Sequence, residues 1–204
     1  MLHVQLSLES KKRFLFALIF LGLTFSVASK PFSAYISESI FKYSDSSSIV
    51  ELYFKVPTSS VEFKVQDGKY QASVFIDLAF INGKDTVTTD RFHMLSPALE
   101  KPAKNVALLE LKRYILPQGQ FALALKIGDD NAPGNFSKLV SVLNTKFSKN
   151  LLQFSDIELA DTIYASKNEN KYSRNGFDII PNVINTLSIN KPSLYFYTEV
   201  YNAS

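Results

Sequence analysis

Histidine is the scarcest side chain in this sequence that could take part in catalysis or bind a metal. There are two histidines, His3 and His93, and no cysteine. His93 lies in TTDRFHML, three residues after Asp90, and a Ser-His-Asp relay or a zinc site would have to use it. One histidine without a second histidine or a cysteine is a poor zinc site. We therefore interpret His93 as a surface or edge residue.

Carboxylates are the second group that could carry chemistry. Asp156, Glu158 and Asp161 lie close together in SDIELAD, and a pair of acids can hydrolyse a glycosidic bond. On a strand, Asp156 and Glu158 would share one face and stand too near each other to flank a sugar. We interpret them as residues of a solvated strand face, and we assign no catalytic residue.

An acidic loop is the third group. Asp129-Asp130-Asn131 in IGDDNAPGN has the composition of a calcium loop but lacks the spaced ligands and the closing glutamate of an EF-hand. Asp, Asn, Pro and Gly also suit a turn, which explains the stretch better. The glycines form neither GxGxxG nor GxxxxGK, so we expect no phosphate cradle, no cofactor and no metal.

Composition indicates a β protein with one or two domains. The 204 residues are 46% apolar and 13% aromatic, with many Phe and Tyr and no Trp, which favours strands and allows a sizeable core. The absence of cysteine excludes disulfides and a lipid anchor on cysteine. A formal charge of +3 is mild, so we expect no nucleic-acid partner.

The N-terminal stretch KKRFLFALIFLGLTFSVASK is typical of a signal peptide. Lys11, Lys12 and Arg13 precede the apolar run from Phe14 to Phe25, and Ser26-Val27-Ala28 offers a cleavage site. The run from Phe14 to Phe25 is shorter than the roughly 20 apolar residues that a membrane-spanning helix needs. An uncleaved membrane anchor is the alternative. We expect a signal helix in residues 1–28, no membrane attachment after cleavage, and export to the periplasm or cell surface of a Gram-negative bacterium.

Period-two alternation predicts an immunoglobulin-like antiparallel β-sandwich over residues 49–148, after a linker over 29–48. In IVELYFKVP, Val50, Leu52, Phe54 and Val56 share one face, and Glu51, Tyr53 and Lys55 the other. This pattern is typical of a half-buried strand, with the second face toward solvent. Asn82-Gly83 suits a type I′ hairpin turn. The pattern resets near residue 149, and residues 149–204 are too few for an independent core, so we expect an incomplete second β-domain there.

The chain ends on SLYFYTEVYNAS, which alternates as a strand. Tyr195, Tyr197 and Tyr201 would share one face, and Leu194, Phe196 and Val200 the other. A tyrosine row can be a contact surface or half-buried packing. An unpaired edge over residues 193–202 would invite strand addition from a partner chain.

Several stretches together resemble one family. LYFKVPTSSVEFKVQDGKYQASVFIDLAF, LPQGQFALALKIGDD, FSDIELA, IIPNV and SLYFYTEVYN are similar to the N-terminal region of GWxTD-domain proteins, which are exported bacterial proteins. The resemblance implies a pair of immunoglobulin-like sandwiches and a downstream domain of unknown function, and it supplies no catalytic residues. The naming motif needs a tryptophan, so it would lie beyond Ser204 and the chain would be a fragment.

We therefore expect a non-enzymatic, exported β-sandwich protein that binds or scaffolds an unidentified ligand. One alternative is an extracytoplasmic hydrolase that uses carboxylates. The other is a subunit that a partner chain completes by strand addition.

Overall fold

The computed structural model describes residues 31–103, 106–187 and 193–203, and this part of the chain is all-β. The predicted signal helix in residues 1–28 lies outside the described residues. One 3-10 turn, Thr58–Ser60, interrupts the strands. The strands are β1 (Tyr35–Lys42), β2 (Ser47–Pro57), β3 (Lys64–Gln66), β4 (Lys69–Gln71), β5 (Ser73–Asn82), β6 (Asp85–Leu95), β7 (Ala107–Pro117), β8 (Gln120–Asp129), β9 (Phe136–Asn144), β10 (Gln153–Phe154), β11 (Glu158–Ala165), β12 (Ser173–Arg174), β13 (Phe177–Pro181), β14 (Tyr195–Tyr197) and β15 (Val200–Tyr201).

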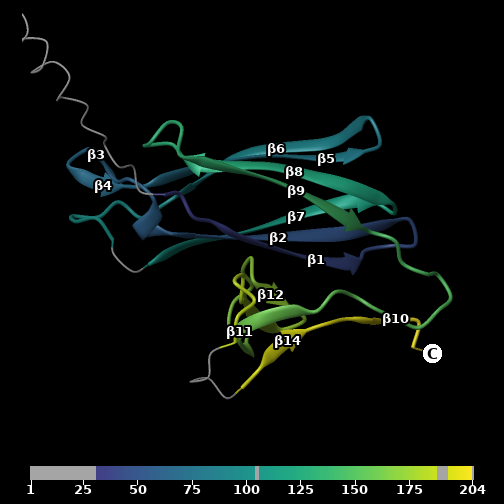
Figure 1. The fold of residues 1–204 in the computed structure, drawn as a ribbon. Helices are drawn as coiled ribbons and strands as arrows, with labels where there is room; N and C mark the ends of the chain where they lie inside the picture. The colour runs from purple at the N-terminus through teal and green to yellow at the C-terminus, as the bar shows by residue number, and fades with distance from the viewer. Residues whose placement is uncertain (1–30, 104–105, 188–192, 204) are drawn as a thin grey trace, which may run out of the picture.

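Seven of these strands form the predicted immunoglobulin-like sandwich. A three-stranded sheet in the order β1-β2-β7 faces a four-stranded sheet in the order β6-β5-β8-β9, and every pairing is antiparallel. Figure 1 shows the two sheets as the upper and middle layers of the molecule. Val50, Leu52, Phe54 and Val56 are fully buried between the sheets, as their alternation predicts, because every second residue of a strand points to the same face.

The predicted linker over residues 29–48 is wrong for its larger part, because residues 35–42 form β1. This strand pairs with β2 from Tyr35↔Lys55 to Lys42↔Ser48 and buries Ile40 and Phe41. The Ser/Asp cluster that suggested a linker is the turn between the two strands. In that turn the Ser44 hydroxyl accepts from the Ser46 N–H at 3.2 Å, a local bond that such residues make in turns.

The strands β10 to β15, which we call the C-terminal layer, cover the outer face of the β1-β2-β7 sheet. The layer contains a four-stranded sheet, β12-β13-β11-β14, and the pair β10-β15, and it lies below β1 and β2 in Figure 1. Tyr53 and Leu111 on the sandwich pack against Val183 of the segment that follows β13. Among the described residues, the buried apolar side chains of this region are Ala160, Ile179, Pro181 and Val183. Contact with the sandwich therefore supplies much of its packing.

This arrangement corrects the half-buried interpretation of β2. Glu51 and Tyr53, which alternate away from the core, are each only 1% exposed because the C-terminal layer covers them. A strand buried on both faces normally reads as a continuous apolar run. Here the charged residue Glu51 interrupts that run, so the alternation indicated that the second face of β2 is exposed to solvent.

The hairpin turns also differ in part from expectation. Asn82 pairs with Asp85, so Gly83 and Lys84 form the loop, and Gly83 alone has a positive φ, of 62°. Glycine at the first central position is typical of a type II′ turn, not of the predicted type I′ turn. Two positive φ angles in succession occur instead at Asp67-Gly68 and at Asn175-Gly176.

Candidate functional site

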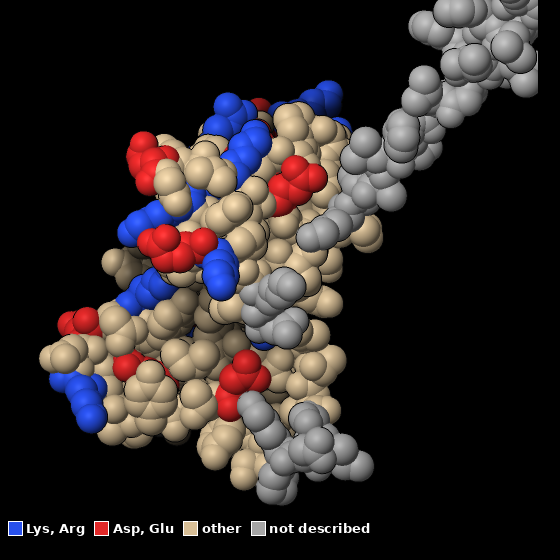
Figure 2. All heavy atoms as spheres, turned by 90° about the vertical axis from the view of Figure 1, so that its left-hand side faces the viewer, with Lys and Arg blue, Asp and Glu red and all other residues tan. Residues whose placement is uncertain are grey.

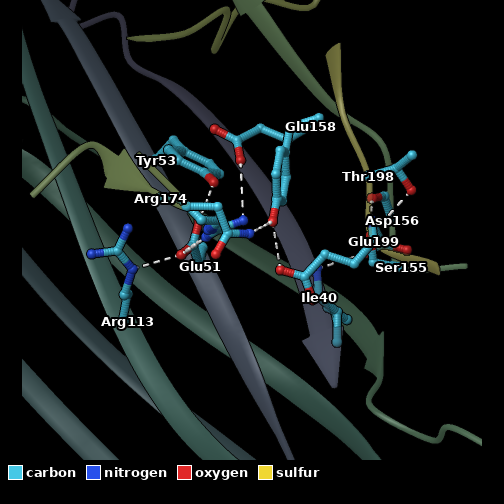
Figure 3. Close-up of polar contacts among 12 residues, drawn as sticks. Ile40, Glu51, Tyr53, Arg113, Ser155, Asp156, Glu158, Arg174, Thr198 and Glu199 are labelled. Atoms are coloured by element: carbon cyan, nitrogen blue, oxygen red, sulfur yellow. Dashed lines mark hydrogen bonds and ion pairs between the residues drawn. The ribbon is translucent and has the colours of Figure 1, made fainter. Parts of the chain in front are cut away.

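The most unusual group of side chains lies between the sandwich and the C-terminal layer. It contains Glu51 and Tyr53 from β2, Arg113 from β7, Glu158 from β11 and Arg174 from β12, and we call it the charge cluster. Figure 3 shows these side chains pointing toward one another across the boundary between the two parts. Glu51 and Glu158 are only 1% and 5% exposed, which is rare for acids unless they are paired.

Glu51 is the centre of the charge cluster. Its Oε1 accepts from the Nε of Arg113 at 2.6 Å and from the Nη2 of Arg174. Its Oε2 accepts from the hydroxyl of Tyr53. The Nη1 of Arg174 lies 3.7 Å from Oε2 of Glu158, so one arginine from the C-terminal layer contacts both buried acids. The charge-assisted bonds to Glu51 compensate for the loss of hydration that burial imposes.

Aromatic rings complete the environment of Arg174. Its guanidinium lies 4.1 Å from the ring centroid of Phe41 and 4.8 Å from that of Tyr197. Arginine stacks well on aromatic faces because its flat cation is weakly hydrated. The β12–β13 hairpin positions this residue, since Arg174 pairs with Phe177 around Asn175-Gly176. The dipeptide Asn-Gly is a strong hairpin signal, and it could have placed Arg174 on a strand from sequence.

Burial changes the acidity of Glu158. Desolvation, together with the negative charge of nearby Glu51, raises the pKa of Glu158 to about 7. Desolvation also raises the pKa of the Tyr53 hydroxyl, so this group stays a hydrogen-bond donor. A carboxyl with a raised pKa can act as a general acid where a substrate reaches it. Here both acids are enclosed between the sandwich and the C-terminal layer, so the charge cluster joins these two parts.

The raised pKa predicts that stability falls as pH rises. Between about pH 4.5 and 7 the folded state holds a proton on Glu158 that the unfolded chain releases, so the free energy of unfolding decreases by up to about 1.4 kcal/mol per pH unit. Glu158→Gln should flatten this dependence and exceed the wild type in stability at pH 8. Urea unfolding at several pH values would measure both effects.

The comparison with wild type isolates Glu158. Glu38 and Asp156, whose pKa values burial also raises, contribute the same slope to both proteins. Asp161→Asn on the same strand is the matched control, because Asp161 is only partly buried. Equal slopes for the wild type and Glu158→Gln would contradict this prediction.

The three acids of SDIELAD do not share a solvated face, which corrects the sequence interpretation. Glu158 is buried in the charge cluster. The Oδ2 of Asp156 accepts from the N–H of Ile40 at 2.9 Å and so covers part of the free edge of β1. Asp161 lines a shallow hollow beside Lys55. The structure thus gives the three side chains three different environments.

His93 lies on the edge strand β6 with its side chain half exposed, as predicted for an edge residue. Asp90 is not its partner, because Asp90 accepts from the hydroxyl of Tyr114 at 2.8 Å. The Nδ1 of His93 instead lies 2.7 Å from Oδ2 of Asp130, and the same oxygen accepts from the Ser73 hydroxyl. A catalytic triad needs the histidine between serine and aspartate. Here the aspartate is in the middle, so these three side chains do not form a triad.

The acidic loop after β8 is held by its own side chains. Asp129 is 1% exposed, and its carboxylate accepts from the N–H of Glu62 at 2.6 Å and of Asn131 at 2.8 Å. Asn131 donates to the carbonyl of Glu62 at 2.9 Å. Asp129 and Asn131 therefore stabilise a turn and bind it to the backbone of Glu62. A turn at this stretch is what the sequence predicts. Within the described residues, no group of three or more acids and histidines could hold a metal ion.

The terminal segment forms two short strands instead of one. β14 pairs with β11, and β15 pairs with β10, with Thr198 and Glu199 between them. Glu199 accepts from the hydroxyls of Tyr197 at 2.7 Å and Tyr201 at 2.5 Å. Tyr201 in turn accepts from the N–H of Lys42 on β1 at 2.9 Å. The two tyrosines therefore pack toward the sandwich, whereas Leu194, Phe196 and Val200 are about half exposed.

No helix in the described part of the chain is long and apolar enough to cross a membrane. Neither the models of known protein families nor the curated proteins include a match to this sequence.

Proposed function

We propose that this chain is a non-enzymatic, exported β-sandwich protein that binds or scaffolds a partner outside the cytoplasm. The observation that carries the proposal is that the two acids of the charge cluster are buried and paired with arginine. These acids, Glu51 and Glu158, are enclosed between the sandwich and the C-terminal layer. Hydrolysis by two acids needs a substrate between them, and this pair serves to join two layers instead. The resemblance to GWxTD-domain proteins supports the exported location, and we propose membership of that family.

The outer face of the four-stranded sheet is the surface that supports a binding role. A shallow hollow crosses β6, β5, β8 and β9, with Ala79 and Ala124 in its floor and Arg91, Lys126 and Lys138 beside it. Binding sites are concave surfaces with a few polar groups. Figure 2 shows basic and acidic side chains interspersed on the side of the molecule that it draws. That mixture offers no extended basic stripe of the kind that nucleic acid selects.

Two measurements test the proposal. Fractionation of cells that express the full chain should place it in the periplasm or at the surface, with Ser29 as the new N-terminus, and a purely cytoplasmic protein would reject the exported location. Hydrolysis of polysaccharide and peptide panels tests the enzymatic alternative. An activity that disappears in Glu158→Gln while the variant remains folded would replace the binding proposal with a hydrolase.

A further inference from the structure

Strand β9 is a long free edge of the sandwich. It is the last strand in the order β6-β5-β8-β9, and among the described residues no strand pairs with its outer side. The Thr145 N–H donates to Gly119 O at 2.9 Å, and Asn135 O accepts from the Asp129 N–H at 3.0 Å. The backbone N–H and C=O groups of the odd-numbered residues of β9 therefore point toward β8. Because bonding alternates in antiparallel pairs, the N–H and C=O groups of even-numbered residues point outward.

Two other edges of the sandwich, β1 and β6, have protection that β9 lacks. At β1, Asp156 and Tyr201 of the C-terminal layer bond the backbone of Ile40 and Lys42. The edge strand β6 carries Asp85, Asp90 and Arg91, and its pairing with β5 is irregular between Phe80 and Ile81. Charges and irregular pairing are the devices by which sandwiches prevent edge-to-edge association.

β9 instead presents exposed apolar side chains. Val140 and Val142 are 70% and 65% exposed, and Phe136 and Leu139 are each 42% exposed. Lys138 is the only charged residue in FSKLVSVLN. Leu139 also lines a hollow that runs beside the start of β1, where Tyr35 is partly exposed. A long, flat, apolar edge strand is a template for strand pairing.

We propose that β9 pairs antiparallel with β9 of a second copy of this chain, about a two-fold axis at Val140. In this register Val140 lies opposite itself, and Lys138 lies opposite Val142 of the other copy. Even-numbered residues then face even-numbered residues, so the outward N–H and C=O groups of both copies are paired. The two four-stranded sheets become one continuous sheet with an isologous interface.

The distribution of charge along β9 suits a second copy as the occupant. No like charges lie opposite each other in this register, because Lys138 is displaced from the axis and meets an apolar neighbour. The aliphatic stem of Lys138 can cover Val142 of the other copy while its ammonium group stays in water. Phe136 lies opposite Asn144, so each aromatic ring meets a short polar side chain and not a second ring.

The test is the oligomeric state of the purified full chain, measured by sedimentation over a dilution series. The wild type should show a reversible monomer–dimer equilibrium. Val140→Lys places two ammonium groups face to face at the axis, and the dimer Kd should rise by about tenfold or more. Val142→Glu faces Lys138 of the other copy, so its dimer should be at least as tight as that of the wild type.

Val87→Lys is the matched control, because Val87 is an exposed valine on the other edge of the same sheet. Its Kd should equal that of the wild type, and thermal unfolding should show that all three variants are folded. A monomeric wild type would overturn the proposal, and so would oligomers larger than a dimer. A wild-type dimer that Val140→Lys leaves unchanged would also overturn it, because the interface would then lie elsewhere.

Discussion

Glu51→Ala should lower the free energy of unfolding by about 3–5 kcal/mol, the usual cost of removing one partner from a buried ion pair. The substitution leaves Arg174, which is mostly buried, without its main acceptor, and it removes the carboxylate to which the hydroxyl of Tyr53 donates. Buried donors without partners cost their full desolvation free energy. We expect the contacts between the sandwich and the C-terminal layer to be lost first, because the charge cluster lies between these two parts.

Urea unfolding at pH 7 measures the loss, and hydrogen exchange at β11 and β13 locates it. Glu51→Gln should be less harmful, since the amide oxygen can still accept from one arginine. Glu100→Ala is the control. The Glu100 side chain is 82% exposed, and its Oε1 is as far as 4.0 Å from the Nζ of Lys69. Such an exposed ion pair contributes little to stability. A loss at Glu51 no larger than at Glu100 would show that the cluster does not hold the two parts together.

Phe41→Ala should cost about 3–5 kcal/mol, the range for truncating a buried phenylalanine. Phe41 is 2% exposed, and its ring contacts both Arg174 and Tyr197. The truncation therefore removes apolar burial and also one aromatic face that stabilises the buried guanidinium. Both effects weaken the attachment of the C-terminal layer to β1.

Two further variants separate these effects in the same urea measurement. Phe41→Leu keeps most of the side-chain volume and loses the aromatic face, so it should cost clearly less than Phe41→Ala. Phe196→Ala, at a half-exposed position on β14, should have a small effect. If Phe41→Leu cost as much as Phe41→Ala, the aromatic contact and not burial would dominate.

The two largest predicted losses concern contacts between segments distant in the sequence. Arg174 and Glu51 are separated by 123 positions, and Phe41 of β1 contacts Arg174 of β12 and Tyr197 of β14. If the charge cluster holds the C-terminal layer in place, these losses should be cooperative in a double-mutant cycle. This physical role differs from catalysis, and it agrees with the proposed binding or scaffolding function.

Sequence alone determined the strands of the sandwich that follow β1, and it determined which face of β2 lines the core. Alternation over IVELYFKVP placed Val50, Leu52, Phe54 and Val56 in the core, because the side-chain period of a strand is two whatever it packs against. Residue types alone indicated that His93 is a surface or edge residue and that the Asp129 loop is a turn. These results depend on local geometry, which neighbouring residues specify.

Only the tertiary structure decided what covers the opposite face of β2. The alternation assigned Glu51 and Tyr53 to solvent, and a polar residue on a strand gives no local sign that a distant arginine will neutralise it. The Ser/Asp turn between β1 and β2 concealed β1, and the reading of SDIELAD missed that Glu158 is buried. A buried charge is tolerable only with partners that the fold brings from elsewhere in the chain, so the charge cluster could not be read from any single stretch.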